Sequence, residues 1–215
     1  MITKLRTALC ALLAAIALLS GTPAHAAEMT LTDAIRALPV AAETNDGYER
    51  TAFRHWIDED RDGCSTRAEV LLEESRTKPV IEANCRIISG TWYSYYDGVT
   101  VVDPAKLDID HMGPLKEAWG SGAKFWTKER RQAYANDLGS ARSLVAVTAA
   151  TNRSKADKDP AQWMPPSADA HCTYIADWVG TKLRWSLSAD QPERDALLRI
   201  AEGCGHQQVT YEPAA

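Results

Sequence analysis

Two short stretches of the chain carry residue types that could bind a hard metal ion and move a proton. One stretch ends in Asp110 and His111, and the other contains Asn152, Arg153 and Lys155. Carboxylate and amide oxygens are ligands that Mg²⁺ prefers, and the pKa of histidine lies near neutral pH, which suits a general base. A metal held there would polarise a phosphodiester and stabilise its leaving oxygen. These residues therefore predict hydrolysis of phosphodiester bonds by an activated water.

Two strands and a helix would have to position these side chains. Residues 107–110 alternate between apolar and polar, which is the period of a half-buried strand. Residues 144–148 form a short apolar run with β-branched members that favours a buried strand, and a helix is expected to begin close to Asn152. If the two strands pair, we expect Asp110 and His111 to lie across from Asn152.

At these residues the chain resembles a known family. Asp110 and His111 are followed by an apolar-Gly-Pro-Leu continuation, and the second motif consists of Asn152, Arg153, Lys155, Asp157, Asp159 and Pro160. Together the motifs resemble HNH endonucleases of the His-Me finger superfamily. More narrowly, they resemble the secreted actinobacterial HNH endonuclease-like proteins, which share a domain with the C-terminal part of GmrSD-type restriction enzymes. The resemblance runs from about Gly47 to Cys204.

The resemblance implies an α+β fold with a ββα-metal core and a role for each motif residue. His111 would be the general base, and Asp110 and Asn152 would hold Mg²⁺ or Mn²⁺. Asparagine at the last HNH position favours Mg²⁺ over a zinc site. The central position, which in relatives is an asparagine that tethers the loop carrying the histidine, is Ser143 here. We further expect Lys155 or Arg153 to neutralise the phosphate in the transition state.

The same motifs also have simpler interpretations. An Asp-His pair at the end of a strand is more often a hydrogen-bonded surface pair, and Asn-Arg-x-Lys is more often a helix cap with a solvated basic face. Two alternatives to the nuclease therefore stay open. One is a non-catalytic, calcium-stabilised secreted binding domain. The other is a degenerate nuclease that binds nucleic acid without cutting it, which Ser143 makes conceivable.

A second ion-binding pattern lies in residues 58–69. The charged positions of the calcium-loop pattern D-x-D-x-D-G-x₅-E are all met, by Asp58, Asp60, Asp62 and Glu69. Two features count against calcium. The eighth loop position, which is usually apolar, is Ser65, and the neighbouring Cys64 is expected in a disulfide. The alternative is a turn of acidic residues that make local salt bridges with Arg61 and Arg67.

The first 26 residues have the features of a signal peptide. Lys4 and Arg6 precede an apolar run over residues 8–19, and the sequence Ala-His-Ala at 24–26 predicts cleavage after Ala26. The apolar run is too short to span a membrane comfortably, and no later stretch qualifies. We therefore expect a secreted protein with no membrane association after cleavage, with a monomer as the default state.

Four cysteines follow the signal peptide, namely Cys64, Cys85, Cys172 and Cys204. An even number in an exported chain predicts two disulfides, for which three pairings are possible, and the absence of a C-x-x-C pair argues against a zinc site. Cys172 opens one predicted helix and Cys204 closes the next. Those ends meet in an antiparallel helix pair, so we favour Cys172–Cys204 and Cys64–Cys85.

The distribution of charge supports a localised nucleic-acid site. The chain carries 24 basic and 29 acidic residues, a formal net charge of −5, which becomes −7 without Lys4 and Arg6. An acidic protein does not coat DNA generally, because phosphate binding needs clustered Lys and Arg. The window from His111 to Pro160 nevertheless has a net charge of +4 and contains the predicted site. We therefore expect a cleft for nucleic acid, DNA more than RNA, although such a run is equally compatible with a solvated helix face.

Periodicity and turn residues predict the remaining elements. Residues 27–46 are expected to be a helical extension packed on a single domain at 47–206, with residues 207–215 a disordered tail. Residues 48–57 predict a helix in which Phe53, Trp56 and Ile57 face the core and His55 is structural. Residues 78–102 predict an antiparallel sheet with a hairpin at Asp97-Gly98. Helices are expected at 127–136, 171–187 and 192–202, and the predicted Cys172–Cys204 disulfide would join the last two.

Overall fold

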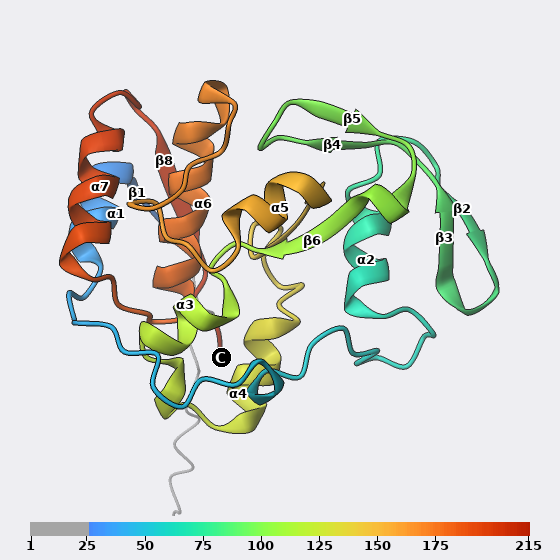
Figure 1. The fold of residues 1–215 in the computed structure, drawn as a ribbon, viewed down its shortest axis with the longest axis horizontal. Helices are drawn as coiled ribbons and strands as arrows, with labels where there is room; N and C mark the ends of the chain where they lie inside the picture. Colours follow the sequence, from blue (N-terminus) through green and yellow to red (C-terminus); the bar gives the residue numbers. More distant parts are fainter. Residues whose placement is uncertain (1–25) are drawn as a thin grey trace, which may run out of the picture.

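The computed structural model describes residues 26–215, so the predicted signal peptide lies almost wholly outside the described residues. These residues form an α+β fold (Figure 1). The helices are α1 (Leu31–Ala37), α2 (Thr66–Glu73), α3 (Leu115–Gly120), α4 (Lys128–Ala135), α5 (Ala149–Lys155), α6 (His171–Arg184) and α7 (Gln191–Ala201). The strands are β1 (Ala27–Thr30), β2 (Val80–Glu82), β3 (Arg86–Ser89), β4 (Trp92–Ser94), β5 (Val99–Val101), β6 (Leu107–His111), β7 (Leu144–Thr148) and β8 (Gln208–Tyr211).

Every strand in residues 26–215 pairs with a single antiparallel neighbour, which gives the ribbons β1–β8, β2–β3, β4–β5 and β6–β7. The sheet predicted over residues 78–102 is therefore two separate ribbons, and the second turns at Asp97-Gly98 as expected, with Gly98 at φ +70°. The outer edge of β7 is closed by side chains. Glu74 accepts a hydrogen bond from the Ala146 amide (3.0 Å), and Ser94 accepts one from the Thr148 amide (3.1 Å). These bonds satisfy backbone groups that an open edge would leave unpaired.

The β6–β7 ribbon lies at the centre of the molecule with apolar clusters on both faces. Leu107 and Ile109 pack toward α2 and Trp92, while Val145 and Val147 pack toward α1, α6 and α7. Figure 1 shows these three helices grouped on one side, with α2 and the β2–β3 ribbon on the other and β6 crossing between them. Burial on both faces explains why residues 144–147 are all apolar rather than alternating.

The helix predicted at 48–57 is wrong, because only a single 3₁₀ turn forms there, at Arg50–Ala52. Trp56 adopts a φ of +59°, which a right-handed helix does not contain. The reason is tertiary. Asn136 donates to the Arg54 carbonyl (2.8 Å) and accepts from the Ile57 amide (3.2 Å), so backbone groups that a helix would pair internally bind a distant side chain instead.

The chain ends also differ from expectation. The predicted disordered tail is wrong, since residues 208–211 form β8, which pairs with β1 in the register Ala27↔Tyr211. Val209 is 2% exposed, and the Ala214 amide donates to the Arg184 carbonyl (2.8 Å). The predicted N-terminal extension does pack on the domain, through α1 against α6 and α7, but it begins as a strand. Both chain ends are therefore held in place by residues that are close in space but distant in the sequence.

Both predicted disulfides are confirmed. Cys64–Cys85 joins the segment before α2 to the 3₁₀ turn before β3, with 5.1 Å between Cα atoms, and Cys172–Cys204 joins the start of α6 to the turn after α7, with 5.4 Å. The helix-pair argument therefore identified the correct ends. Among the described residues, no helix combines the length and the apolar character that crossing a membrane requires.

Candidate functional site

The register of the β6–β7 ribbon differs from the arrangement predicted for the two motifs. Asp110 pairs with Val145 and His111 with Leu144, so neither lies across from Asn152. Asn152 instead belongs to α5, which starts immediately after β7 and folds back over β6. There the side-chain nitrogen of Asn152, Nδ2, donates to an Asp108 carboxylate oxygen (3.3 Å). The helix, rather than the strand, brings the second motif to the first, because the chain reverses at the Thr148 N-cap.

Side-chain alternation along β6 divides the motif between two faces. Asp108 and Asp110 contact residues of α5, whereas His111 contacts the aromatic ring of Trp56 on the other face. The Arg153 guanidinium lies 3.5 Å from Asp108, and this pair is open to solvent, with the Arg153 side chain 76% exposed. Such exposed pairs add little stability, so Arg153 remains available for a ligand.

Lys155 is fully buried and holds the end of β6. Its Nζ donates to Asp110 (2.5 Å) and to the carbonyls of His111 (2.9 Å) and Met112 (2.8 Å). The Tyr96 hydroxyl donates to the same Asp110 oxygen (2.6 Å). Burial lowers the pKa of Lys155 and raises that of Asp110, and the contact between the two opposes both shifts. All three acceptors of Lys155 are protein oxygens, so its ammonium is directed inward rather than toward a bound phosphate.

His111 is held in one tautomer. Its Nε2 lies 2.9 Å from the Ala135 carbonyl oxygen, which can only accept, so Nε2 carries the hydrogen and Nδ1 keeps a lone pair. Burial lowers the pKa of His111 to about 3, although the bond to Ala135 acts in the opposite direction. The imidazole is consequently neutral at physiological pH, with Nδ1 able to accept a proton. Neutrality provides the lone pair that a general base needs, while the lowered pKa makes His111 a weaker base than a free imidazole.

The segment before the acidic loop covers His111, a contact that no sequence pattern predicts. His111 is only 6% exposed, and its ring centroid lies 5.2 Å from Trp56 and 6.2 Å from His55. The positive charge of Arg50 contributes to the lowered pKa of His111. No spacing signal joins these residues to His111 more than fifty positions later. In the sequence, only the residue types themselves mark these residues as candidates for a contact with His111.

Ser143 makes a tether at the position where the resemblance expects an asparagine. Its backbone carbonyl accepts from the Met112 amide (2.9 Å), and its hydroxyl donates to Asp137 (2.7 Å). Asp137 lies two residues after Ala135, whose carbonyl orients His111. The Asp137 carboxylate is also bound by the Arg184 guanidinium (2.7 and 2.8 Å). Serine thus links the end of β6 to the turn that holds the histidine.

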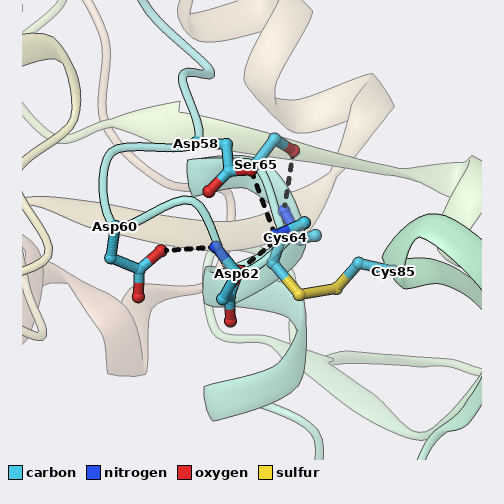
Figure 2. The surroundings of a disulfide bond; sticks show 8 residues. Asp58, Asp60, Asp62, Cys64, Ser65 and Cys85 are labelled. Carbon is cyan, nitrogen blue, oxygen red and sulfur yellow. Dashed lines mark hydrogen bonds between the residues drawn. A yellow bond between two sulfur atoms is a disulfide. The ribbon is translucent and has the colours of Figure 1, made fainter.

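The acidic loop folds as a compact turn beside the first disulfide (Figure 2). One carboxylate oxygen each from Asp58, Asp60 and Asp62 lies within 4.8 Å of the others. The Gly63 amide donates to Asp58 (3.1 Å), and partial burial followed by the three aspartates raises the pKa of Glu69. Arg67, expected to pair with the loop, instead donates to two backbone carbonyls before and within β6. The loop charges therefore lack that predicted partner.

Comparisons with known proteins place this chain in a family. Residues 65–200 match the model for the C-terminal domain of GmrSD restriction endonucleases. The chain is also 40% identical over 159 residues, 74% of this chain and 76% of the other, to an uncharacterized secreted protein of Arthroderma benhamiae. No solved structure matches it. The matched region begins in the acidic loop and spans β6, β7 and α5, so the chain belongs to the family of the GmrSD restriction endonuclease C-terminal domain.

Proposed function

We propose that this protein is a secreted, metal-dependent HNH endonuclease that hydrolyses phosphodiester bonds of DNA, with His111 as its general base. The observation that carries the proposal is the pinned neutral tautomer of His111 at the end of β6. Membership of a restriction-endonuclease domain family supports a nuclease-related function. The strand-strand-helix order of β6, β7 and α5 is also what a His-Me finger core would require.

The residues over one face of β6 offer the kind of ligand atom that a hard metal ion prefers. Asp108, Asp110 and Asn152 all offer oxygens there, and no thiolate competes. Lys155 and Tyr96 occupy one Asp110 oxygen, while the other, Oδ1, makes no hydrogen bond to residues 26–215. We assign Asp110 and Asn152 as ligands of Mg²⁺ or Mn²⁺, with Asp108 beside them. When bound, the ion would supply Lewis-acid polarisation of the phosphodiester.

The chain's own residues then have distinct tasks. His111 Nδ1 takes the proton of the attacking water while Ala135 keeps Nε2 protonated. Arg153, exposed next to Asp108, balances the phosphate charge. Lys155 acts through Asp110 and the two carbonyls it binds, and keeps the strand end in place. Because His111 is 6% exposed and faces Trp56 rather than Asp108 and Asp110, both Trp56 and the end of β6 must shift before a water at the metal reaches Nδ1.

Secretion is the second part of the proposal. Its support is the signal-like sequence at residues 1–26, the two disulfides and the secreted relative from Arthroderma benhamiae. The actinobacterial source implied by the sequence resemblance stays a prediction, as does the monomeric state.

A structural calcium ion in residues 58–69 is the third part. The clustered carboxylates of Asp58, Asp60 and Asp62, together with the nearby Glu69, favour it. If His111 proved irrelevant to any cleavage, this loop would mark the alternative, a calcium-stabilised binding domain without catalysis.

The deciding experiment is plasmid nicking by the purified mature protein. Wild type, His111→Ala and a control, His206→Ala, are compared in Mg²⁺, Mn²⁺, Ca²⁺ and EDTA. His206 is exposed and far from β6 in sequence, so its loss should leave cleavage unchanged. We expect metal-dependent cleavage that falls by about 10²- to 10⁴-fold only in His111→Ala. Cleavage that survives His111→Ala, or none with DNA or RNA in any metal, would reject the proposal.

A further inference from the structure

A groove of about 330 Å³ runs between α4 and the turn at Arg50–Ala52. Figure 1 shows that turn lying against α4, and the Arg131 guanidinium joins them by donating to the Ala52 carbonyl (3.2 Å). The charged side chains that line the groove are Arg54, Lys128, Glu129 and Arg131. Three are basic and one is acidic, so the groove is locally positive on a protein whose net charge is negative.

The two outermost basic side chains are free to bind a ligand. Arg54 and Lys128 are exposed, and neither forms a salt bridge within residues 26–215. Arg131 differs, because its guanidinium also donates to the carbonyls of Ala123 and Trp126 and so supports the backbone. It adds charge to the groove without being available for contact.

Both walls of the groove lead to His111. On one wall, α4 ends at Ala135, whose carbonyl binds the His111 imidazole. On the other, the residues after Arg54 are His55 and Trp56, whose rings contact His111. Asn136 joins the walls by donating to the Arg54 carbonyl (2.8 Å). A strand lying in the groove would therefore lead toward the proposed base, which Trp56 covers.

We propose that this groove holds the phosphate backbone of the substrate strand next to the scissile bond, with Arg54 and Lys128 contacting phosphates; the inference rests on the proposed nuclease function. Guanidinium and ammonium groups are the usual phosphate contacts, and such contacts position a nucleic acid without reading its bases. Because the protein as a whole is acidic, binding must depend on a local positive path of this kind.

The test measures binding separately from cleavage. Fluorescence anisotropy of a fluorescein-labelled 20-base-pair DNA duplex is followed against salt in Mg²⁺, using His111→Ala as the non-cleaving background. Arg54→Ala and Lys128→Ala are added to that background, with Arg199→Ala and Lys106→Ala as matched controls. The control residues are exposed and lie on α7 and before β6, away from the groove. Circular dichroism confirms that each variant is folded.

Each groove variant should reduce the slope of log K against log salt by about 1, which corresponds to about 8-fold weaker binding at 0.1 M salt. The controls should match the background. Glu129→Gln, which removes the one acidic lining charge, should strengthen binding by about twofold.

Two other results would overturn the inference in distinguishable ways. Groove variants that bind like the background, while wild type still cuts plasmid through His111, would place the substrate elsewhere and leave the nuclease proposal standing. No binding by the background, together with no plasmid cleavage by wild type, would remove the inference and the proposed function together.

Discussion

Two fully buried lysines, Lys155 and Lys182, stand in opposite charge environments. Lys155 faces one carboxylate, Asp110, and two backbone carbonyls. Lys182 faces three carboxylates, at 2.5 Å from Glu193, 2.8 Å from Glu117 and 3.7 Å from Glu43. The first site is balanced and lies at the proposed catalytic centre. The second has excess negative charge and ties the N-terminal segment to α3, α6 and α7.

The electrostatic consequences differ accordingly. Burial raises the pKa of Glu43 to about 8, with Glu117 adding to the shift, and burial raises that of Glu193 to about 7. Burial would lower the pKa of Lys182, but the surrounding carboxylates outweigh it and raise the pKa. The most perturbed group of carboxylates is therefore a structural junction. In this protein, shifted pKa values alone do not identify the functional site.

The largest expected effect comes from removing the cation of the balanced pair. Lys155→Met leaves Asp110 buried without its charged partner, so the free energy of unfolding should fall by about 3–5 kcal/mol in urea denaturation. Lys155→Met combined with Asp110→Asn should recover much of that stability but not plasmid cleavage. A double variant that cuts normally would contradict the assignment of Asp110 to the site.

Lys182→Met should cost less and should depend on pH, because the carboxylates around it can take up protons. We expect a loss of about 3 kcal/mol at pH 8 that shrinks toward pH 5. Plasmid cleavage per folded molecule should be unchanged. Loss of cleavage in folded Lys182→Met would show that the two lysines are not functionally distinct.

The pH dependence of stability should have two limbs with separate origins. Glu43 and Glu193 have pKa values raised from 4.5 to about 8 and about 7, so the stability they contribute is complete below pH 4.5 and is lost as the pH rises from there through the raised values. His111 has a pKa lowered to about 3, so the unfolded chain binds its proton first and stability falls as the pH drops below 6.5. The two limbs overlap between pH 4.5 and 6.5, where two carboxyls outweigh one histidine, so the melting temperature should be highest near the acidic end of that range. Glu43→Gln should flatten the alkaline limb and leave the acidic one.

Calcium should give the smallest effect, because the acidic loop lies at the surface. With an affinity typical of extracellular modules, calcium at about ten times its Kd would add ~1.4 kcal/mol, or about 3–5 °C in Tm. Asp60→Ala should abolish that rise, while Asp103→Ala, an acidic residue outside the loop, should not. An unchanged Tm of wild type in calcium would leave the loop as a turn of acidic residues.

Features determined by residues close in sequence were predictable. The Asp97-Gly98 turn accommodates a positive φ, and Thr127 accepts the Arg130 amide as the N-cap of α4. The Cys172–Cys204 bond followed from the ends of two neighbouring helices. The identity of the motif residues also needed no structure, because carboxylate, amide and imidazole chemistry belongs to the side chains themselves.

Tertiary structure alone decided what those residues contact. Asn152 meets Asp108, Lys155 turns inward to Asp110, and Ser143 reaches Asp137, because α5 folds back over β6 and the turn after α4 closes on the ribbon. The 48–57 segment and the C-terminal strand followed the same rule, since partners many residues away outcompeted local preference. The chemistry of the side chains could thus be predicted from the sequence. The residues that each side chain contacts depended on long-range packing, which no local pattern encodes.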